Sequence, residues 1–406
     1  MKCTLHNLGC KVNSYETEAM RQLLEAAGYE IVEFGSETAD VYIINTCTVT
    51  NIADRKSRQM LHKAKKDNPN AVVVAAGCYV QEAGEKLLAD EAVDIIVGNN
   101  RKGQIVEVLE EYFKGRNIDN SFIDINKTRE YENLEINASL AHTRAYIKIQ
   151  DGCNQFCTYC IIPFARGRVR SRKIEDIIDE VRKLAESGCH EIVVTGIHLS
   201  SYGLDFDNTE YNAQPVPNAE RLLQVLEAIA AVDGIDRIRL GSLEPRIITD
   251  TFLERLSAIP QICPHFHLSL QSGCDETLKR MNRRYDTEEF REGVEKIRRY
   301  FDKPAITTDV IVGFPGETDE EFAITRKYLE EINFFEMHVF KYSRRKGTIA
   351  DRMENQIADS VKSERSDALI ELDEELSRAY RESFAGSAEV VLVEEYVECD
   401  GIKYAV

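Results

Sequence analysis

Two long stretches of this chain alternate short apolar segments with amphipathic helical segments, and this alternation restricts the fold more than any other feature. In the first stretch, which ends near residue 115, four apolar segments have the length of buried strands: residues 4–8, 41–45, 72–76 and 94–97. Helical patterns lie between them at residues 14–27, 52–66 and 81–89. Strands that alternate with helices form a parallel sheet, so we expect an α/β, doubly wound domain.

The second stretch repeats the strand–helix unit six times and predicts a different α/β architecture. Its predicted strands are residues 145–150, 191–196, 237–241, 265–270, 306–312 and 335–340. Six such units indicate an incomplete, TIM-like (β/α)6 barrel, whose site lies at the C-terminal ends of the strands.

The boundaries of the predicted units follow from changes in pattern. The first domain covers residues 1–115, a polar linker covers 116–142 with one strand at 121–124, and the barrel covers 143–385, with a charged helix at 359–381. A new β-pattern begins at 388–393 and 396–397. The segment 386–406 is too short for an independent β-domain, so we expect the start of a small β-barrel that is cut short in this chain.

Composition narrows the class of protein. The chain has 406 residues, of which 43% are hydrophobic, and it carries a net charge of −19. No membrane-spanning run and no secretory leader stand in the sequence, so we expect a cytoplasmic protein. In a reducing compartment, clustered cysteines indicate metal or catalytic sites. The acidic balance argues against indiscriminate nucleic-acid binding but permits a local basic surface.

Cys153, Cys157 and Cys160 form a C-x3-C-x2-C loop directly after the first predicted barrel strand. Structural zinc usually takes four ligands, and a fourth cysteine or histidine is missing nearby. A redox C-x2-C pair would leave Cys153 unexplained. The third alternative, unrelated buried cysteines, fits poorly with three in eight residues. The spacing therefore favours a four-iron, four-sulfur (4Fe–4S) cluster with one iron free of protein ligands.

Cys10, Cys47 and Cys78 are far apart, but each follows a predicted strand of the first domain. Parallel sheets bring the carboxyl ends of their strands to one edge, where ligands bind. A shared metal site is one interpretation, and three small buried side chains are the other. The remaining cysteines are interpreted as buried apolar residues: Cys3, Cys189, Cys263, Cys274 and Cys399.

The C-x3-C-x2-C loop resembles that of the radical S-adenosylmethionine superfamily. That resemblance implies that S-adenosylmethionine binds the open iron and is cleaved to a 5′-deoxyadenosyl radical. It implies cofactor contacts at Tyr159, beside the last cysteine. Further contacts are implied at the ends of later strands, by Gly196, His198, Ser242, Glu244, Gln271 and Val312.

The N-terminal motifs resemble those of the methylthiotransferases within that superfamily. The motifs are GCKVN at 9–13, NTCTVT at 45–50 and GCY at 77–79, and the resemblance extends over nearly the whole chain. It implies that Cys10, Cys47 and Cys78 hold a second 4Fe–4S cluster, whose open iron carries the sulfur to be transferred. It also implies that the terminal β-pattern begins a TRAM-like RNA-binding domain.

Three branches of the family differ in substrate. GCKVN, the segment after Cys47 and the GIHL motif at 196–199 look like the branch that methylthiolates carbon 2 of N6-threonylcarbamoyladenosine at position 37 of tRNA. S-adenosylmethionine would then serve as both methyl donor and radical source. The alternatives are methylthiolation of a ribosomal-protein side chain or of isopentenyladenosine in tRNA. A non-enzymatic iron–sulfur or RNA-binding protein is a further alternative, against which the three-cysteine loop argues.

The resemblance also implies partners. They are a tRNA substrate, an external one-electron reductant such as a flavodoxin, and a source of sulfur, with no membrane and a monomeric enzyme. Arg166 and Arg168 beside the radical loop, with Arg344 and Arg345 after the last barrel strand, are predicted to contact RNA phosphates. Structural ion pairs are the competing interpretation of these arginines.

Overall fold

A computed structural model describes residues 1–116, 123–137, 143–206, 219–393, 396–399 and 402–405. Its first domain is a parallel sheet in the order β2-β1-β3-β4-β5. The strands are β1 (Lys2–Asn7), β2 (Glu30–Ile31), β3 (Val41–Thr46), β4 (Val72–Gly77) and β5 (Ile95–Val97). The strand order reverses between β1 and β3, which is the arrangement of a doubly wound sheet and confirms the predicted class.

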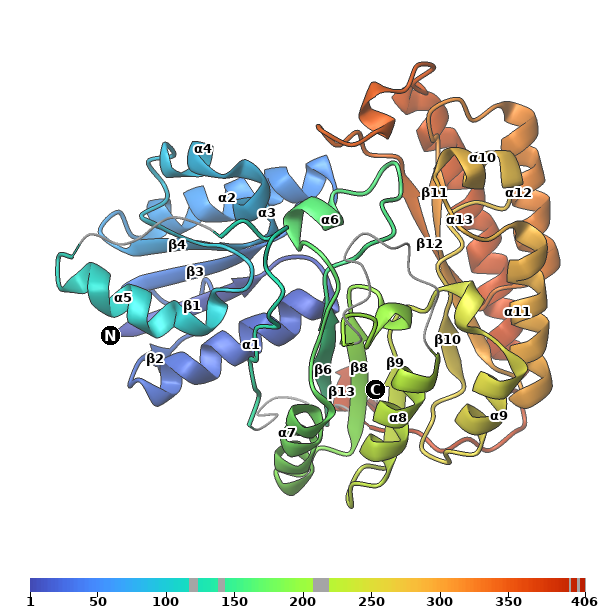
Figure 1. Cartoon of the computed structure of the whole chain (residues 1–406), viewed down its shortest axis with the longest axis horizontal. Helices are drawn as coiled ribbons and strands as arrows, with labels where there is room; N and C mark the ends of the chain where they lie inside the picture. Colours follow the sequence, from blue (N-terminus) through green and yellow to red (C-terminus); the bar gives the residue numbers. More distant parts are fainter. Residues whose placement is uncertain (117–122, 138–142, 207–218, 394–395, 400–401, 406) are drawn as a thin grey trace.

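Helices cover both faces of this sheet (Figure 1). On one face lie α1 (Lys11–Ala26) and α5 (Ile105–Phe113), which bury Met20, Leu24 and Leu109 against the strands. On the other face lie α2 (Asn51–Asp67), α3 (Cys78–Ala83) and α4 (Glu85–Leu88). Thr50 caps α2, since its side chain accepts a hydrogen bond from the backbone N–H of Ala53.

The barrel consists of two parallel arcs of three strands. The first arc is β6 (Arg144–Asp151), β8 (Glu191–Gly196) and β9 (Arg237–Leu240), and the second is β10 (His265–His267), β11 (Ala305–Val312) and β12 (Glu336–Lys341). Single bridges at Ile238–Ile262 and Leu243–Leu268 connect the arcs. This incomplete barrel is the predicted one, and a short strand β7 (Arg170–Ser171) pairs antiparallel with β6.

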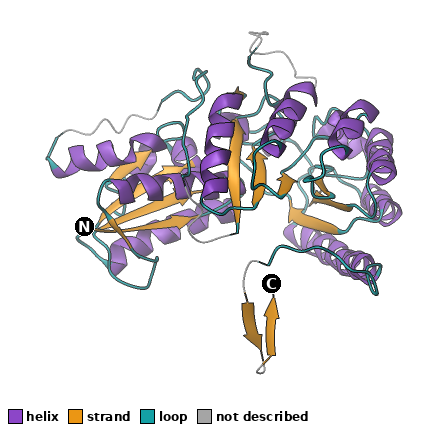
Figure 2. Ribbon diagram, turned by 90° about the horizontal axis from the view of Figure 1, so that it is seen from below, coloured by secondary structure: helices purple, strands orange, loops and turns teal. Residues whose placement is uncertain are grey.

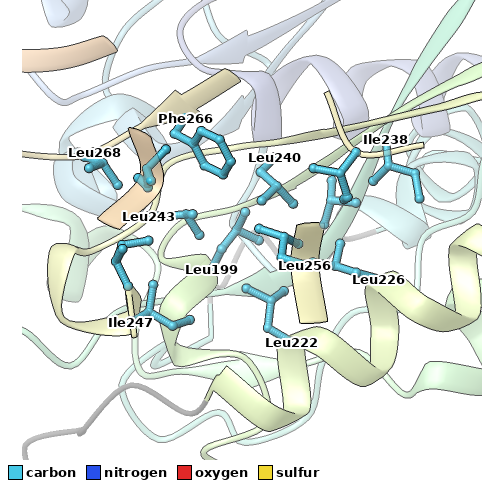
Figure 3. Packing of buried hydrophobic residues seen from close by; sticks show 14 of the residues in the cluster. Leu199, Leu222, Leu226, Ile238, Leu240, Leu243, Ile247, Leu256, Phe266 and Leu268 are labelled. Carbon is cyan, nitrogen blue, oxygen red and sulfur yellow. The ribbon is translucent and has the colours of Figure 1, made fainter. Parts of the chain in front are cut away.

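The outer faces of the barrel strands pack against a layer of helices, and Figure 3 shows part of this core. Ile238 and Leu240 of β9 meet Leu222 and Leu226 of α8. Burying each such side chain contributes about 1.5–3 kcal/mol. The barrel helices are α6 (Ile162–Ala165), α7 (Ile174–Glu186), α8 (Ala219–Ala230), α9 (Asp250–Ser257), α10 (Asp275–Arg280), α11 (Thr287–Tyr300), α12 (Asp319–Ile332) and α13 (Asp359–Glu382). Short 3-10 turns lie at Leu199–Ser201, Pro245–Ile247 and Ala350–Arg352 of the barrel and at Lys102–Gln104 of the first domain.

The C-terminal region differs from the prediction. Residues 388–393 form no strand, because they have no strand to pair with, and most of them lie exposed, with Val390 at 90% exposure. A two-stranded hairpin follows instead, made of β13 (Tyr396–Cys399) and β14 (Ile402–Ala405). Figure 2 shows this hairpin apart from the rest of the molecule. The strand predicted at 121–124 begins outside the described residues, and no helix within the described ranges is long and apolar enough to cross a membrane.

Candidate active site: two cysteine sets and the pocket between them

The first cysteine set lies at the C-terminal edge of the N-terminal sheet. Cys10 stands between β1 and α1, Cys47 follows β3, and Cys78 begins α3 directly after β4. Burial, with added repulsion from Cys78 and Cys10, raises the pKa of the Cys47 thiol to about 12. The sheet topology therefore brings three cysteines from distant parts of the sequence into electrostatic contact.

Two glycines permit this close approach. Gly9 precedes Cys10 with a φ of +104°, and a Cβ there would lie 2.8 Å from the Cys47 Sγ. Gly77 precedes Cys78 with a φ of +91°, and a Cβ there would lie 2.5 Å from the Asn45 Oδ1. Both backbone conformations favour glycine, so any other residue at these positions would move a cysteine.

The second set, Cys153, Cys157 and Cys160, occupies the loop after β6. Burial, with added repulsion from Cys157, raises the pKa of the Cys153 thiol to about 12. The loop is anchored to the connection between α10 and α11, where the Thr158 N–H donates to the Met281 carbonyl at 3.0 Å. From the same connection, Arg283 donates a hydrogen bond to the Cys157 Sγ at 3.2 Å.

The distances between thiols discriminate between kinds of metal site. A zinc ion with Zn–S bonds of about 2.3 Å needs sulfurs about 3.8 Å apart. Among the described residues, the only group whose ligand atoms all lie within 4.8 Å of one another is His267, Asp309 and His338, which includes no cysteine. Each cysteine triplet is therefore wider than a single zinc requires, and three widely spaced thiols fit a polynuclear iron–sulfur cluster.

A pocket of about 240 Å³ lies between the two cysteine sets. Its wall includes Cys160 from the barrel loop and Val49 and Thr50, which follow Cys47. The rest of the wall is mostly aromatic and aliphatic: Tyr159, Ile161, Ile162, Gln271, Asp309, Ile311, Phe340, Lys341, Tyr342 and Ser343. The predicted cofactor residues Tyr159 and Gln271 thus lie beside the barrel cysteines, in a space of mainly apolar character.

A second group of predicted cofactor residues lies at the ends of β8 and β9. The His198 Nε2 is 3.6 Å from a carboxylate oxygen of buried Glu244, and Gln155 of the cysteine loop donates to the same oxygen at 3.2 Å. Ser242 is exposed and Gly196 half-buried beside them. Val312 differs from the prediction, because its side chain is 1% exposed and faces the helix layer. Its neighbour Ile311 faces the pocket instead, as alternation along a strand requires.

Comparisons with known proteins agree with this arrangement. The family model "Radical SAM superfamily" matches residues 147–329, and "Uncharacterized protein family UPF0004" matches residues 2–98. The chain is 44% identical over 96% of its length to the threonylcarbamoyladenosine tRNA methylthiotransferase MtaB of Bacillus subtilis, of which it covers 84%. The chain belongs to the methylthiotransferase family of radical S-adenosylmethionine enzymes. The predicted family is thereby confirmed.

Further relatives of this methylthiotransferase belong to two groups of tRNA-modifying proteins. It is 39% identical over 97% of its length to the protein named MtaB in Aquifex aeolicus, covering 93% of it. It is 36% identical over 97% of its length to the tRNA-2-methylthio-N(6)-dimethylallyladenosine synthase of the same organism, covering 88%. The solved structure of the radical S-adenosylmethionine methyltransferase TsrM from Kitasatospora setae, at 15% identity, shares the fold with a TM-score of 0.61 over 86% of this chain and 73% of that chain.

Arg166 of the methylthiotransferase does not reach RNA, contrary to the prediction, because it is fully buried between the domains. It donates to Glu16 at 2.8 Å and to both oxygens of Asp151 at 3.2 Å. Lys148 donates to the same Glu16 at 2.8 Å, and Lys102 also pairs with it. Burial opposes ionisation of Glu16, but Arg166, Lys102 and Lys148 hold its pKa well below the usual range. We call this set the Glu16 network: Glu16, Lys102, Lys148, Asp151 and Arg166.

Arg345 was also wrongly predicted to contact RNA, since it is 3% exposed. It donates to Asp54 at 2.6 Å and to Thr48 at 2.8 Å, and thereby fastens the segment after β12 to the segment after Cys47. Arg168 is half-buried over the Phe156 ring, and the Arg344 side chain is 58% exposed beside Asp351. RNA contact by Arg168 and Arg344 stays a prediction.

The structure adds residues that the sequence did not indicate. Arg283 lies on Cys157, and Asn99 donates to the Cys78 Sγ at 3.6 Å and to the Ala165 carbonyl at 2.7 Å. Neither shares a local motif with its cysteine. Arg283 stands in a basic run at 279–284 whose only sequence signal is that of a solvated surface. The cysteines predicted to be apolar, Cys3, Cys189, Cys263 and Cys274, are buried, and the side chain of Cys399 lies outside the description.

Proposed function

We infer that this chain methylthiolates carbon 2 of N6-threonylcarbamoyladenosine at position 37 of tRNA. The observation that carries the proposal is that one pocket is lined both by Cys160 of the barrel triplet and by Val49 and Thr50, which closely follow Cys47 of the N-terminal triplet. A generic radical enzyme needs one such triplet, whereas sulfur insertion needs a second site. The similarity to threonylcarbamoyladenosine tRNA methylthiotransferases over 96% of the chain supports the choice of substrate.

The two cysteine sets have different roles in this proposal. Cys153, Cys157 and Cys160 hold the cluster that binds S-adenosylmethionine, and Cys10, Cys47 and Cys78 hold the cluster that carries sulfur. When bound, these groups supply a carbon radical able to remove the unreactive hydrogen on carbon 2 and a methylated sulfur to replace it. No side chain of ordinary acid–base strength could activate that carbon–hydrogen bond.

The protein residues around the clusters provide charge and shape. Iron–sulfur clusters with thiolate ligands carry negative charge, and hydrogen bonds to the sulfurs tune their reduction potential. Arg283 donates to Cys157, and Arg166 lies within electrostatic range of Cys10 and Cys78. Each cluster would therefore have one guanidinium beside it. The mainly apolar pocket wall between them would limit the water beside the path between radical and substrate.

The proposed reaction requires further partners. Reductive cleavage of S-adenosylmethionine needs an external one-electron donor, for which we propose a flavodoxin-like protein. The sulfur given up in each turnover has to be replaced from an outside source. We propose that the enzyme acts as a monomer on tRNA in the cytoplasm, with RNA contacts at Arg168 and Arg344.

Product analysis tests the proposed function. Protein reconstituted anaerobically with iron and sulfide is incubated with S-adenosylmethionine, a reductant and tRNA that carries threonylcarbamoyladenosine. We expect the 2-methylthio derivative in nucleoside digests examined by mass spectrometry. Parallel reactions with dimethylallyladenosine-containing tRNA and with ribosomal protein address the alternatives. Product only in either parallel reaction would contradict the proposed substrate, and no product with S-adenosylmethionine left intact would contradict the enzyme class.

Gly152→Ala should prevent loading of the barrel cluster. Gly152 has a φ of +71°, and a Cβ there would lie 1.9 Å from the Arg168 carbonyl oxygen, so the cysteine loop must move. Reconstituted iron is expected to fall to about half, that is about four per chain, because the first site remains. Iron analysis measures this directly.

Gly188→Ala provides the matched control for Gly152→Ala. Gly188 also has a positive φ, of +90°, but no atom lies within 4 Å of its Cβ position. It therefore carries the same backbone strain without the clash, and its iron content should equal that of the wild type. Equal iron in the two variants would show that the steric argument is wrong.

A further inference from the structure

Part of the inner face of the barrel carries polar side chains. Side chains alternate along each strand, so the residues between the core-facing Ile238, Leu240, Phe266 and Val310 point into the lumen. They are Arg239, His265, His267, Asp309 and His338, on four neighbouring strands. Asp309 also belongs to the wall of the pocket between the cysteine sets, so the pocket reaches the strand positions just above these residues.

The N-terminal domain adds a cation to this lumen. Lys11, the first residue of α1, is attracted by Asp309 and repelled by Arg239 and Arg144. No hydrogen bond or ion pair of Lys11 exists within the part of the chain that the structure describes. The Lys11 side chain is exposed, and it is free to contact an anion placed beside Arg239.

The lumen carries more positive than negative charge. Glu191 is shared by Arg237 at 2.8 Å and Arg239 at 3.0 Å, so one carboxylate serves two guanidiniums. Burial, Arg239 and Lys11 lower the pKa of His265 to about 4, which keeps this imidazole neutral at pH 7. Its Nδ1 is buried and has no hydrogen-bond partner among the described residues. The His265 Nδ1 is thus an unsatisfied polar atom beside Arg239, which shares its carboxylate, and near Lys11, which has no ion pair among the described residues.

A divalent cation is the competing occupant, and the charges oppose it. The His267 Nε2 is 3.3 Å from the Asp309 Oδ2, and the His267 and His338 rings stack at 5.8 Å, so three ligand atoms lie close together. Lys11 and Arg239 nearby would repel a metal ion. The same two cations favour the binding of an anion. Asp309 is already paired with His267, whose other ring nitrogen contacts the Thr307 hydroxyl at 3.0 Å.

The depth of Arg239 in the lumen determines which anion can reach it. Arg239 is in register with Val193, three residues before the end of β8 at Gly196, so its backbone lies about 10 Å below the rim. A ligand attached to iron at the cysteine loop stays at the rim. A group that hangs from a nucleoside in the pocket extends past Asp309 toward Lys11 and Arg239.

We propose that Lys11 and Arg239, with His265 beside them, form a carboxylate subsite that binds the threonyl carboxylate of the substrate nucleoside. This rests on the proposed function, in which the substituent on the adenine carries that carboxylate. A dimethylallyl substituent has no charge to offer these cations. Lys11 and Arg239 are then specificity-determining residues. Their charge-assisted hydrogen bonds favour a nucleoside with a charged substituent over one with an apolar substituent.

The test compares two anticodon stem-loop RNAs that differ only at the threonyl group. One carries the natural carboxylate and the other its neutral carboxamide. We measure kcat/KM with reconstituted enzyme, and the dissociation constant of each RNA by fluorescence anisotropy. Wild type should prefer the carboxylate by about tenfold to a hundredfold, the range for charge-assisted hydrogen bonds. Lys11→Met and Arg239→Gln should each bring both ratios close to one.

Controls separate recognition from folding and from cofactor binding. Lys11→Arg keeps the charge and should keep the preference, as should Lys279→Met, which removes an exposed lysine on α10. Because Lys11 is next to Cys10, iron content and 5′-deoxyadenosine formation without RNA are measured for Lys11→Met to check that this variant still holds its clusters. If it does not, the result for Arg239→Gln alone decides whether the proposed subsite exists. If Arg239→Gln keeps the preference for the carboxylate RNA, the proposed subsite is wrong. It is also wrong if Arg239→Gln raises the KM for S-adenosylmethionine instead of removing that preference. If the wild-type enzyme is inactive on the carboxylate RNA, the result contradicts the proposed function and not only the subsite.

Discussion

Replacing Cys153, Cys157 or Cys160 with alanine is expected to abolish methylthiolation and also the formation of 5′-deoxyadenosine. Replacing Cys10, Cys47 or Cys78 should abolish methylthiolation but leave cleavage of S-adenosylmethionine measurable. The difference follows from the geometry, because the two triplets occupy separate loops on separate domains. Chromatography of both nucleoside products from one reaction measures the two outcomes together. The loss of product should exceed a thousandfold, which corresponds to about 4 kcal/mol.

The cysteine series needs a control for the loss of a thiol as such. Cys189 is a buried core cysteine just before β8, outside both sets, and its thiol donates to the backbone carbonyls of Thr143 and Glu191. Cys189→Ala should keep both activities and all reconstituted iron. If Cys10→Ala formed the full amount of methylthio product, the role of the N-terminal triplet would be refuted.

Glu16→Ala is expected to destabilise the protein by about 3–5 kcal/mol, because it leaves buried cations without their carboxylate. Glu16 is 1% exposed and pairs with Lys102, Lys148 and Arg166, each with a fully buried side chain. Denaturant unfolding measured at pH 7 gives the change in free energy. Glu18→Ala, on the same helix but with a side chain 32% exposed, should change stability by less than about 1 kcal/mol.

The same substitution should change the dependence of stability on pH. The pKa of folded Glu16 lies well below the ordinary value of 4.5, so its ionisation stabilises the fold above that value. This contribution is lost as the pH falls from about 4.5 toward the folded pKa. Unfolding free energies of wild type should therefore decline more steeply below pH 4.5 than those of Glu16→Ala. Parallel curves for the two proteins would show that the Glu16 network is not the source of the slope.

The sequence predicts the features that depend on neighbouring residues. Cys10, Cys47 and Cys78 were placed at one edge because each follows an apolar run, and parallel strands end together. The helix at Asp359–Glu382 and the strand β11 follow from periodicity in the same way. Residues 388–393 show the limit of this reasoning, since a β-pattern becomes a strand only where a partner strand is available.

The partners of buried charges could not be predicted from the sequence. Arg166 and Arg345 stand in basic runs that look like solvated surface, yet their carboxylates lie 150 and 291 residues earlier in the chain. Burial of such charges depends on how two domains pack, and no local pattern records that packing. The same holds for Arg283 and its contact with Cys157 across 126 residues.

The position of Arg345 has a consequence for the order in which the enzyme is made. The ribosome delivers Cys10, Cys47 and Cys78 within the first fifth of the chain, but two buried cations that pack around their site, Arg166 and Arg345, emerge later. Arg345 follows the last barrel strand, so the segment after Cys47 becomes fastened only when that strand has been synthesised. We expect the sulfur-carrying site to receive its iron after translation of the barrel, although its ligands are the first to leave the ribosome.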